Sequence, residues 1–120
     1  MVSQVQGNLN TELNTIRLVK EFLPAGTLSG APKYKAVQLI DDIESSGRSY
    51  YGGLLGWIGF NNDINTCILI RSALFENGVM TYRAGAGVVI SSDPQKELEE
   101  VNNKITLILN TLKEFTSYTL

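Results

Sequence analysis

The sequence predicts an α+β fold in which antiparallel strands pack against helices. Apolar residues recur at helical spacing before residue 45 and after residue 93, whereas residues 51–90 alternate with a period of two. The dipeptide Asn77-Gly78 is a strong signal for a two-residue β-hairpin turn. We see no internal repeat or linker, so residues 1–120 are expected to form a single domain.

The first part of the chain predicts one short strand and two helices. Residues 1–8 alternate apolar and polar side chains, as a strand does. Asn10 or Thr11 is expected to cap a helix that runs to about Phe22. A second helix is predicted from Pro32 to about Glu44, with four apolar residues to bury: Ala36, Val37, Ile40 and Ile43.

Three strands are predicted next, over residues 51–60, 64–75 and 79–90. The turn-forming residues 61–63 and Asn77-Gly78 separate them, which favours an antiparallel meander. The middle strand is apolar on both alternating faces, so we expect it to be covered on both sides. Cys67 lies in this strand and is therefore predicted to be a buried structural thiol.

A long last helix is predicted to begin at Asp93, as the N-cap, and Pro94, in the first turn. Residues 116–120 are expected to fray at its end. Six apolar residues recur at helical spacing and form a stripe that must pack on something. These residues are Leu98, Val101, Ile105, Ile108, Leu112 and Phe115.

The composition is that of a soluble globular protein, with 43% hydrophobic and 18% charged residues. At this length, folding should bury roughly 65% of the unfolded surface, enough for a core. A net charge of −2 gives no electrostatic case for nucleic acid or an anionic membrane as partner. No segment has the pattern of a membrane span or signal peptide, so we expect a cytoplasmic protein.

The stretch FLPAGTLSGAPKYK, residues 22–35, is the first that suggests a site. It contains two glycines and two prolines within nine residues and leads directly into a helical pattern. The residues fit either an ordinary loop-to-helix junction or an anion site that uses the backbone amides and the hydroxyls of Thr27 and Ser29. The spacing around Lys33 does not meet the phosphate-loop pattern.

Polar residues in the second half of the chain suggest further chemistry. Glu97 and Glu100 are spaced so that two carboxylates can meet one cation such as Mg²⁺, although a solvated acidic face has the same pattern. Arg71 ends an apolar stretch and would need a carboxylate partner if buried. Tyr51 can be a core aromatic or can present its hydroxyl to a substrate. The sequence contains no histidine, which excludes a histidine base or metal ligand within this chain.

Five motifs occur in an order and spacing that cover most of the chain. They are PAGTLSGAPK at residues 24–33, YGG at 51–53, IR at 70–71, AGAG at 84–87 and ELEEVNNK at 97–104. Together they resemble the C-terminal part of the chorismate-utilising enzymes. The strongest resemblance is to the anthranilate synthase component I family, and aminodeoxychorismate synthase component I is a close relative.

The resemblance implies an Mg²⁺-dependent lyase that converts chorismate and ammonia to anthranilate and pyruvate, a step of tryptophan biosynthesis. A glutamine amidotransferase subunit would supply the ammonia. Val2 and Ser3 match the end of the family's HxVS motif, so its catalytic histidine would lie one position before Met1. We therefore expect residues 1–120 to be a partial chorismate-binding domain that lacks the N-terminal part of the enzyme and is inactive alone. The alternatives are aminodeoxychorismate synthase of folate biosynthesis, or a non-catalytic binding or assembly module.

The resemblance also implies roles for individual residues. The metal ligands would be Glu97 and Glu100, with Lys104 beside them. Arg71 would bind one chorismate carboxylate, and backbone amides would bind the other. The remaining substrate contacts implied in this way are Thr27, Tyr51, Gly85, Ala86 and Gly87.

Overall fold

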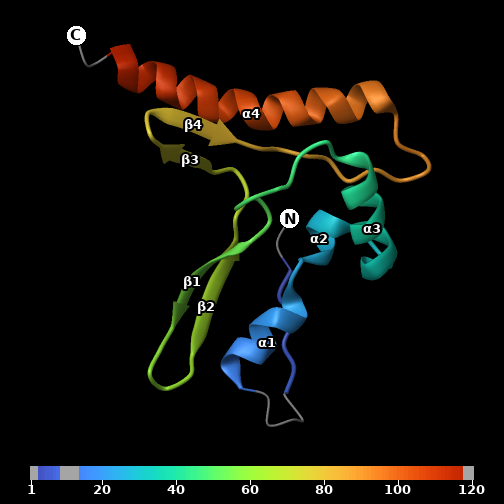
Figure 1. Cartoon of the computed structure of the whole chain (residues 1–120), viewed down its shortest axis with the longest axis vertical. Helices are drawn as coiled ribbons and strands as arrows, with labels where there is room; N and C mark the ends of the chain where they lie inside the picture. Colours follow the sequence, from blue (N-terminus) through green and yellow to red (C-terminus); the bar gives the residue numbers. More distant parts are fainter. Residues whose placement is uncertain (1–2, 9–13, 118–120) are drawn as a thin grey trace.

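The computed structural model describes residues 3–8 and 14–117, and it confirms the α+β class (Figure 1). Helix α4 lies along the β3–β4 hairpin at one end of the molecule, whereas the β1–β2 hairpin extends toward the other end (Figure 1). The elements in chain order are α1 (Thr15–Phe22), α2 (Gly26–Ser29), α3 (Lys33–Ile43), β1 (Leu54–Ile58), β2 (Ile64–Ile68), β3 (Ala73–Glu76), β4 (Val79–Tyr82) and α4 (Pro94–Ser117).

Local capping chemistry decides where the helices begin. The Asp93 carboxylate accepts hydrogen bonds from the amides of Gln95 and Lys96, both at 3.0 Å, which confirms the predicted start of α4. Helix α3 also agrees with its predicted range to within a residue. The predicted cap of α1 was wrong. Asn10 and Thr11 lie outside the described residues, and the cap is Asn14, whose side chain accepts from the Arg17 amide at 2.8 Å.

The strands form two separate two-stranded antiparallel sheets, so the predicted meander is wrong. Strand β1 pairs with β2 and β3 pairs with β4, and the predicted strand over residues 64–75 is broken between them. At the break Arg71 adopts a left-handed φ of 52°, which turns the chain away from the first sheet. The predicted strand over residues 79–90 ends at Tyr82, and described residues 3–8 form no strand.

The β3–β4 turn agrees with the sequence. Asn77 and Gly78 have φ values of 50° and 76°, and Glu76 pairs with Val79 across the turn. Two consecutive positive φ values are what a type I′ hairpin requires, and asparagine followed by glycine adopts them at the lowest steric cost.

The expected hydrophobic core is missing from the described part of the chain, where no residue is fully buried. The accessible surface is 10432 Å², against roughly 6,400 Å² for a compact protein of this mass. The radius of gyration is 17.6 Å, where roughly 14 Å is typical for this length. The elements therefore spread apart and leave their apolar faces open.

Individual residues show the same correction. Cys67 is exposed and is not a buried thiol, because neither face of the β1–β2 hairpin is closed by a second layer. On α3, the side chain of Ile43 is 77% exposed. On α4, Leu98 is exposed while the next four members of the stripe are half-buried, and the Phe115 side chain lies outside the described part. Among the described helices, none combines the length and hydropathy that crossing a bilayer requires.

We expect this open architecture to be visible in solution. Because unfolding would expose little additional apolar surface, the isolated chain should unfold in urea with an m value below about 1 kcal/mol/M, and it should bind a hydrophobic dye while folded. Circular dichroism provides the control that helices are present before denaturant is added. A steep cooperative transition without dye binding would contradict the open arrangement.

Candidate functional site

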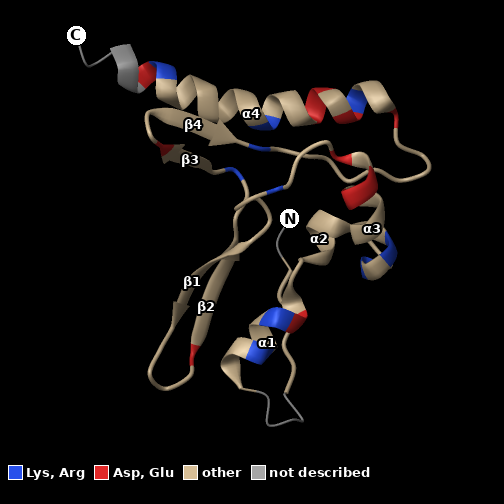
Figure 2. Ribbon diagram, viewed as in Figure 1, with Lys and Arg blue, Asp and Glu red and all other residues tan. Residues whose placement is uncertain are grey.

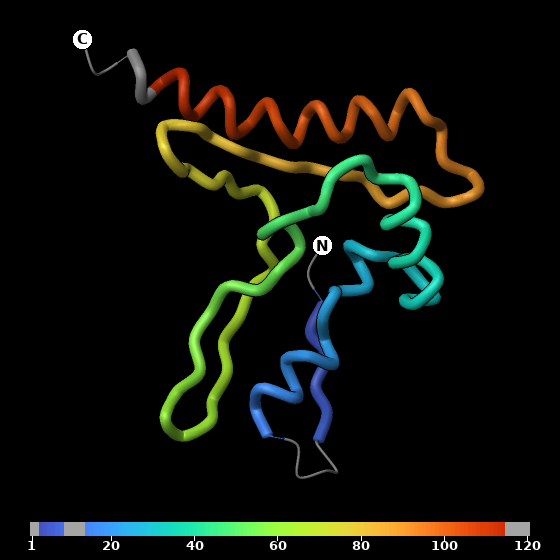
Figure 3. Tube along the Cα trace, in the orientation of Figure 1, coloured from blue at the N-terminus to red at the C-terminus, as the bar shows by residue number. Residues whose placement is uncertain are grey.

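The candidate site forms where residues 51–53 lie between the α2 turn and residues 84–87, and residues 84–87 in turn contact α4. Tyr51, in the loop between α3 and β1, places its hydroxyl against Gly85, where an added Cβ would lie 3.3 Å from the hydroxyl oxygen. Gly52, with φ +82°, lies against Leu28 of α2 in the same way, at 3.4 Å. The tube in Figure 3 shows residues 83–90 running beside α4. Three of the predicted motifs are therefore brought together.

Lys104 connects α4 to this cluster. Its ammonium group donates a hydrogen bond of 2.9 Å to the carbonyl oxygen of Gly85 and forms an ion pair of 2.5 Å with Glu100 one turn earlier on the helix. The lysine side chain is 30% exposed, so the contact is partly shielded from water. This arrangement holds a positive charge directly beside the glycine segment.

Residues 85–87 offer unpaired hydrogen-bond donors. Within the described residues, the amides of Gly85, Ala86 and Gly87 donate to no backbone or side-chain acceptor. Gly85 and Ala86 are half-buried. Amide groups that are partly withdrawn from water and lack a partner favour an anionic ligand, above all next to an ammonium group.

The acidic residues of α4 do not by themselves complete a metal site. Figure 2 shows most of the acidic positions of this helix in its first half, with one more near its C-terminal end, and Glu97 and Glu100 lie one turn apart in the first half. In the described ranges, no three Asp, Glu, His or Cys side chains come close enough to hold a metal ion. Mg²⁺ commonly takes one or two protein carboxylates and completes its shell with water and substrate oxygens. The pair fits an ion whose other ligands come from elsewhere.

Two predicted site residues lie apart from this cluster. Arg71 is exposed at the left-handed kink before β3, and within the described residues its guanidinium has no partner. Thr27 lines an open apolar pocket of about 460 Å³ between α1, α2 and the β1–β2 hairpin. Other residues that line this pocket are Leu18, Phe22, Leu54, Ile64 and Ile68.

Two of the groups considered for an anion site in residues 22–35 have partners within the chain. The Ser29 hydroxyl donates to the carbonyl oxygen of Ala25 at 3.2 Å, and Lys33 reaches back to the carbonyl oxygens of Glu21 and Leu23. The Lys33 contacts satisfy carbonyl oxygens at the end of α1. Ser29 and Lys33 are therefore engaged within the junction, which also contains the single turn of α2 that the sequence did not predict.

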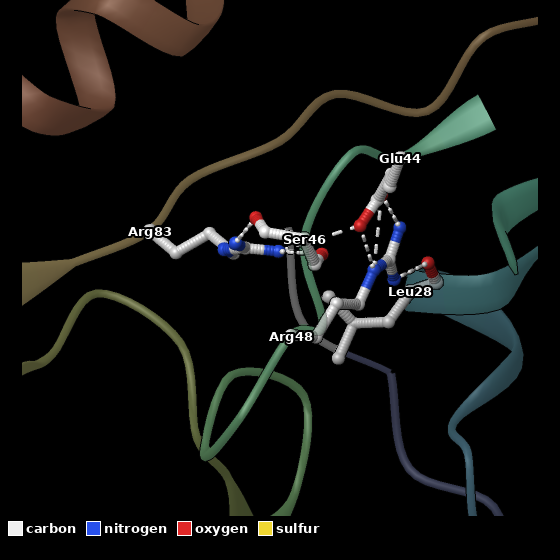
Figure 4. A network of polar contacts seen from close by, with 5 residues as sticks. All are labelled: Leu28, Glu44, Ser46, Arg48 and Arg83. Atoms are coloured by element: carbon white, nitrogen blue, oxygen red, sulfur yellow. Dashed lines mark hydrogen bonds and ion pairs between the residues drawn. The ribbon is translucent and has the colours of Figure 1, made fainter.

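A polar network beside the cluster was missed by the sequence analysis (Figure 4). The Glu44 carboxylate accepts hydrogen bonds from Nε of Arg48 at 3.0 and 3.1 Å and from Nη1 of Arg83 at 3.4 Å. Arg48 also donates to the carbonyl oxygen of Leu28 at 3.1 Å, and Arg83 donates to the carbonyl oxygen of Ser46 at 3.2 Å. The i,i+4 spacing of Glu44 and Arg48 was the available signal. Nothing local indicates Arg83.

Tyr50 is a second missed residue. Its hydroxyl donates to the carbonyl oxygen of Thr81 at 2.8 Å and lies 3.3 Å from that of Ser72. The loop that carries Tyr51 is thereby attached to the open end of the β3–β4 hairpin, beside both of its strands. No sequence pattern distinguishes Tyr50 from its neighbour.

Comparison with known proteins gives consistent matches. The family described as chorismate binding enzyme matches residues 1–110. Anthranilate synthase component 1 of Salmonella typhimurium and that of Escherichia coli are each 46% identical over 112 residues, which is 93% of this chain and 22% of theirs. The Acetivibrio thermocellus protein of the same name is 40% identical over 114 residues, 95% of this chain and 23% of its own. The chain therefore spans less than a quarter of the length of these relatives.

The Glu44 network should depend on pH. The hydrogen bonds from Arg48, together with the charges of both arginines, hold the pKa of the Glu44 carboxyl below its usual value against the opposing effect of partial burial. A lowered pKa means that the contacts stabilise the structure above about pH 4.3 and are lost as the pH falls through the folded-state pKa. We expect the Arg48 Nε resonance to shift in this acid range.

The Glu44→Gln variant supplies the control for this titration. Its side chain has nearly the same shape but does not titrate, so the Arg48 resonance should no longer follow the pH. An unchanged titration of Arg48 in the variant would show that another group is responsible.

Proposed function

This chain belongs to the family of chorismate binding enzymes, and on that basis we propose that it forms the C-terminal part of a chorismate-binding lyase of the anthranilate synthase type. The observation that carries the proposal is the cluster at Gly85, where the Tyr51 hydroxyl and the Lys104 ammonium lie beside three amides that have no acceptor among the described residues. Chorismate has two carboxylates, and this group of donors suits one of them.

The chain's own residues would bind and orient the substrate. The amides of residues 85–87 would hold a carboxylate, and the hydroxyl of Tyr51 would limit how the ring lies against them. The guanidinium of Arg71, which is free within the described residues, would take the second carboxylate. Thr27 would supply a hydroxyl from α2. The roles of Arg71 and Thr27 require that the segments which carry these two residues face the bound substrate.

Glu97 and Glu100 would hold Mg²⁺, which when bound neutralises carboxylate charge and polarises the leaving hydroxyl. Lys104 already pairs with Glu100. The ammonium group and the metal ion would therefore compete for this carboxylate, unless substrate oxygens also bind the two cations. The 120 residues contain no histidine, so a histidine base would have to come from a separate polypeptide region. A glutamine amidotransferase subunit is the proposed source of ammonia.

The open apolar faces support a role as one part of a larger enzyme. The pocket beside Thr27 and the exposed side chains of β1, including Leu55 and Trp57, are the two sides of one hairpin. A sheet that is apolar on both sides is stable when both sides are covered. The relatives contain several times the length of this chain, and we propose that the corresponding remainder supplies those covers.

The first test is activity by complementation. The folded chain alone, given chorismate, Mg²⁺ and ammonium, should produce no anthranilate fluorescence, because its only proposed metal ligands are Glu97 and Glu100 and it contains no histidine. Addition of a polypeptide that corresponds to the preceding part of component 1 should restore production. Anthranilate formed by the chain alone would refute the proposal of a partial site, and aminodeoxychorismate as product would identify the related synthase instead.

A second test addresses the Gly85 cluster in the complemented enzyme. Gly85→Ala places a methyl group 3.3 Å from the Tyr51 hydroxyl and should weaken chorismate binding by about tenfold, equivalent to roughly 1.4 kcal/mol. The matched control is Gly7→Ala, where the new methyl group meets no atom within 4 Å. Equal affinities for the two variants would remove Gly85 from the proposed site.

A further inference from the structure

We propose that Glu44 is a positioning residue that holds the three substrate-facing segments of this chain in a single arrangement. These segments are the α2 turn, residues 51–53 and residues 84–87, and they lie far apart in the sequence. The inference rests on the proposed function, because those segments are the proposed chorismate contacts. Glu44 itself is not one of the proposed substrate contacts.

The backbone and the side chain of Glu44 are both held by hydrogen bonds. Glu44 is the C-cap of α3, and its own amide donates to the Ile40 carbonyl oxygen at 2.9 Å. Its carboxylate therefore projects from the end of a regular helix. Both of its oxygens accept hydrogen bonds, so the side chain has little freedom to rotate away.

Arg48 connects the Glu44 carboxylate to the first two segments. While Nε and Nη2 face the Glu44 carboxylate, Nη1 donates to the carbonyl oxygen of Leu28 at 3.1 Å, which fixes the α2 turn. The same guanidinium carbon lies 5.8 Å from the centre of the Tyr51 ring. A planar cation held over an aromatic face restricts the tilt of the ring and hence the direction of its hydroxyl. Arg48 thus connects Thr27's turn with Tyr51.

Arg83 connects the Glu44 carboxylate to the third segment. This arginine lies directly before residues 84–87, and its guanidinium donates to the Glu44 carboxylate, the Ser46 carbonyl oxygen and, at 2.5 Å, the Ser46 hydroxyl (Figure 4). The start of the glycine segment is therefore held against the α3–β1 loop. The opposite side of that segment is held by Lys104 at Gly85.

Little hydrophobic packing duplicates these contacts, because the described residues contain no buried core and the contact of Leu28 with Gly52 joins only two of the segments. In a compact protein, three loops of this kind would be located mainly by the layers beneath them. Here one carboxylate bridges two arginines that are 35 positions apart in the chain. The side chains of Glu44, Arg48 and Arg83 are each about one-third exposed or less, so the expected effect of losing a contact is modest.

Amide hydrogen exchange of the chain without substrate tests the proposal. Glu44→Gln preserves shape but removes the charge, and it should accelerate exchange by about three- to fivefold in residues 28–30 and 51–53 together, whose amides donate hydrogen bonds. The amides of residues 85–87 have no acceptor among the described residues, so the third segment is followed by its backbone amide chemical shifts, which should move in the same variant. The matched control is Asp42→Asn, which removes one charge from the same helix at a residue with no partner among those described. Glu44→Asp retains the charge on a shorter side chain and should restore part of the protection.

Several results would overturn the proposal. Faster exchange confined to residues 44–48 would mean that Glu44 stabilises only its own loop. Exchange in the parent chain that is already as fast as in an unstructured peptide at residues 28–30 and 51–53, with random-coil amide shifts at residues 84–87, would mean that the carboxylate holds nothing. Because no chorismate is present, either result is distinguishable from a failure of the proposed function, which the complementation assay measures.

Discussion

The carboxylate of Glu44 is the point through which separate parts of this chain are held in contact. Hydrogen bonds from Arg48 and Arg83 converge on it, and through them the α2 turn, the loop before β1 and the segment after β4 share one anchor. Charge-assisted hydrogen bonds suit this task because they are directional as well as attractive. Their partial exposure also means that the arrangement is held by small free energies.

That dependence on polar contacts follows from how little apolar surface is buried. Both sheets have only two strands, and a two-stranded sheet without a covering layer is marginal by itself. The apolar residues of β1 and β2 are nevertheless placed on both faces, as they would be in a strand buried between two layers. The apolar residues are thus placed as if both faces of this sheet were covered, and the described residues supply only part of that cover. This agrees with the small share of its relatives' length that the chain spans.

The site shows the same division between what is present and what must be added. Tyr51, Gly85 and Lys104, from motifs that are 19 to 53 positions apart, lie next to one another. Glu97 and Glu100 lie on the border of the same helix, but no third acidic group joins them within the described residues. Donors for a carboxylate are therefore more complete than ligands for a metal ion.

The sequence by itself determined the features whose causes are local. The Asp93 cap and the Asn77-Gly78 turn were predicted correctly, because each depends on the conformational preferences of a few adjacent residues. Periodicity likewise located α3 and α4, and motif order identified the family. The tertiary structure alone decided that Arg71 breaks a strand, that Cys67 is exposed and that Arg83 reaches Glu44. Each of these depends on which distant surface is available to cover or contact the residue, and periodicity contains no information about that surface.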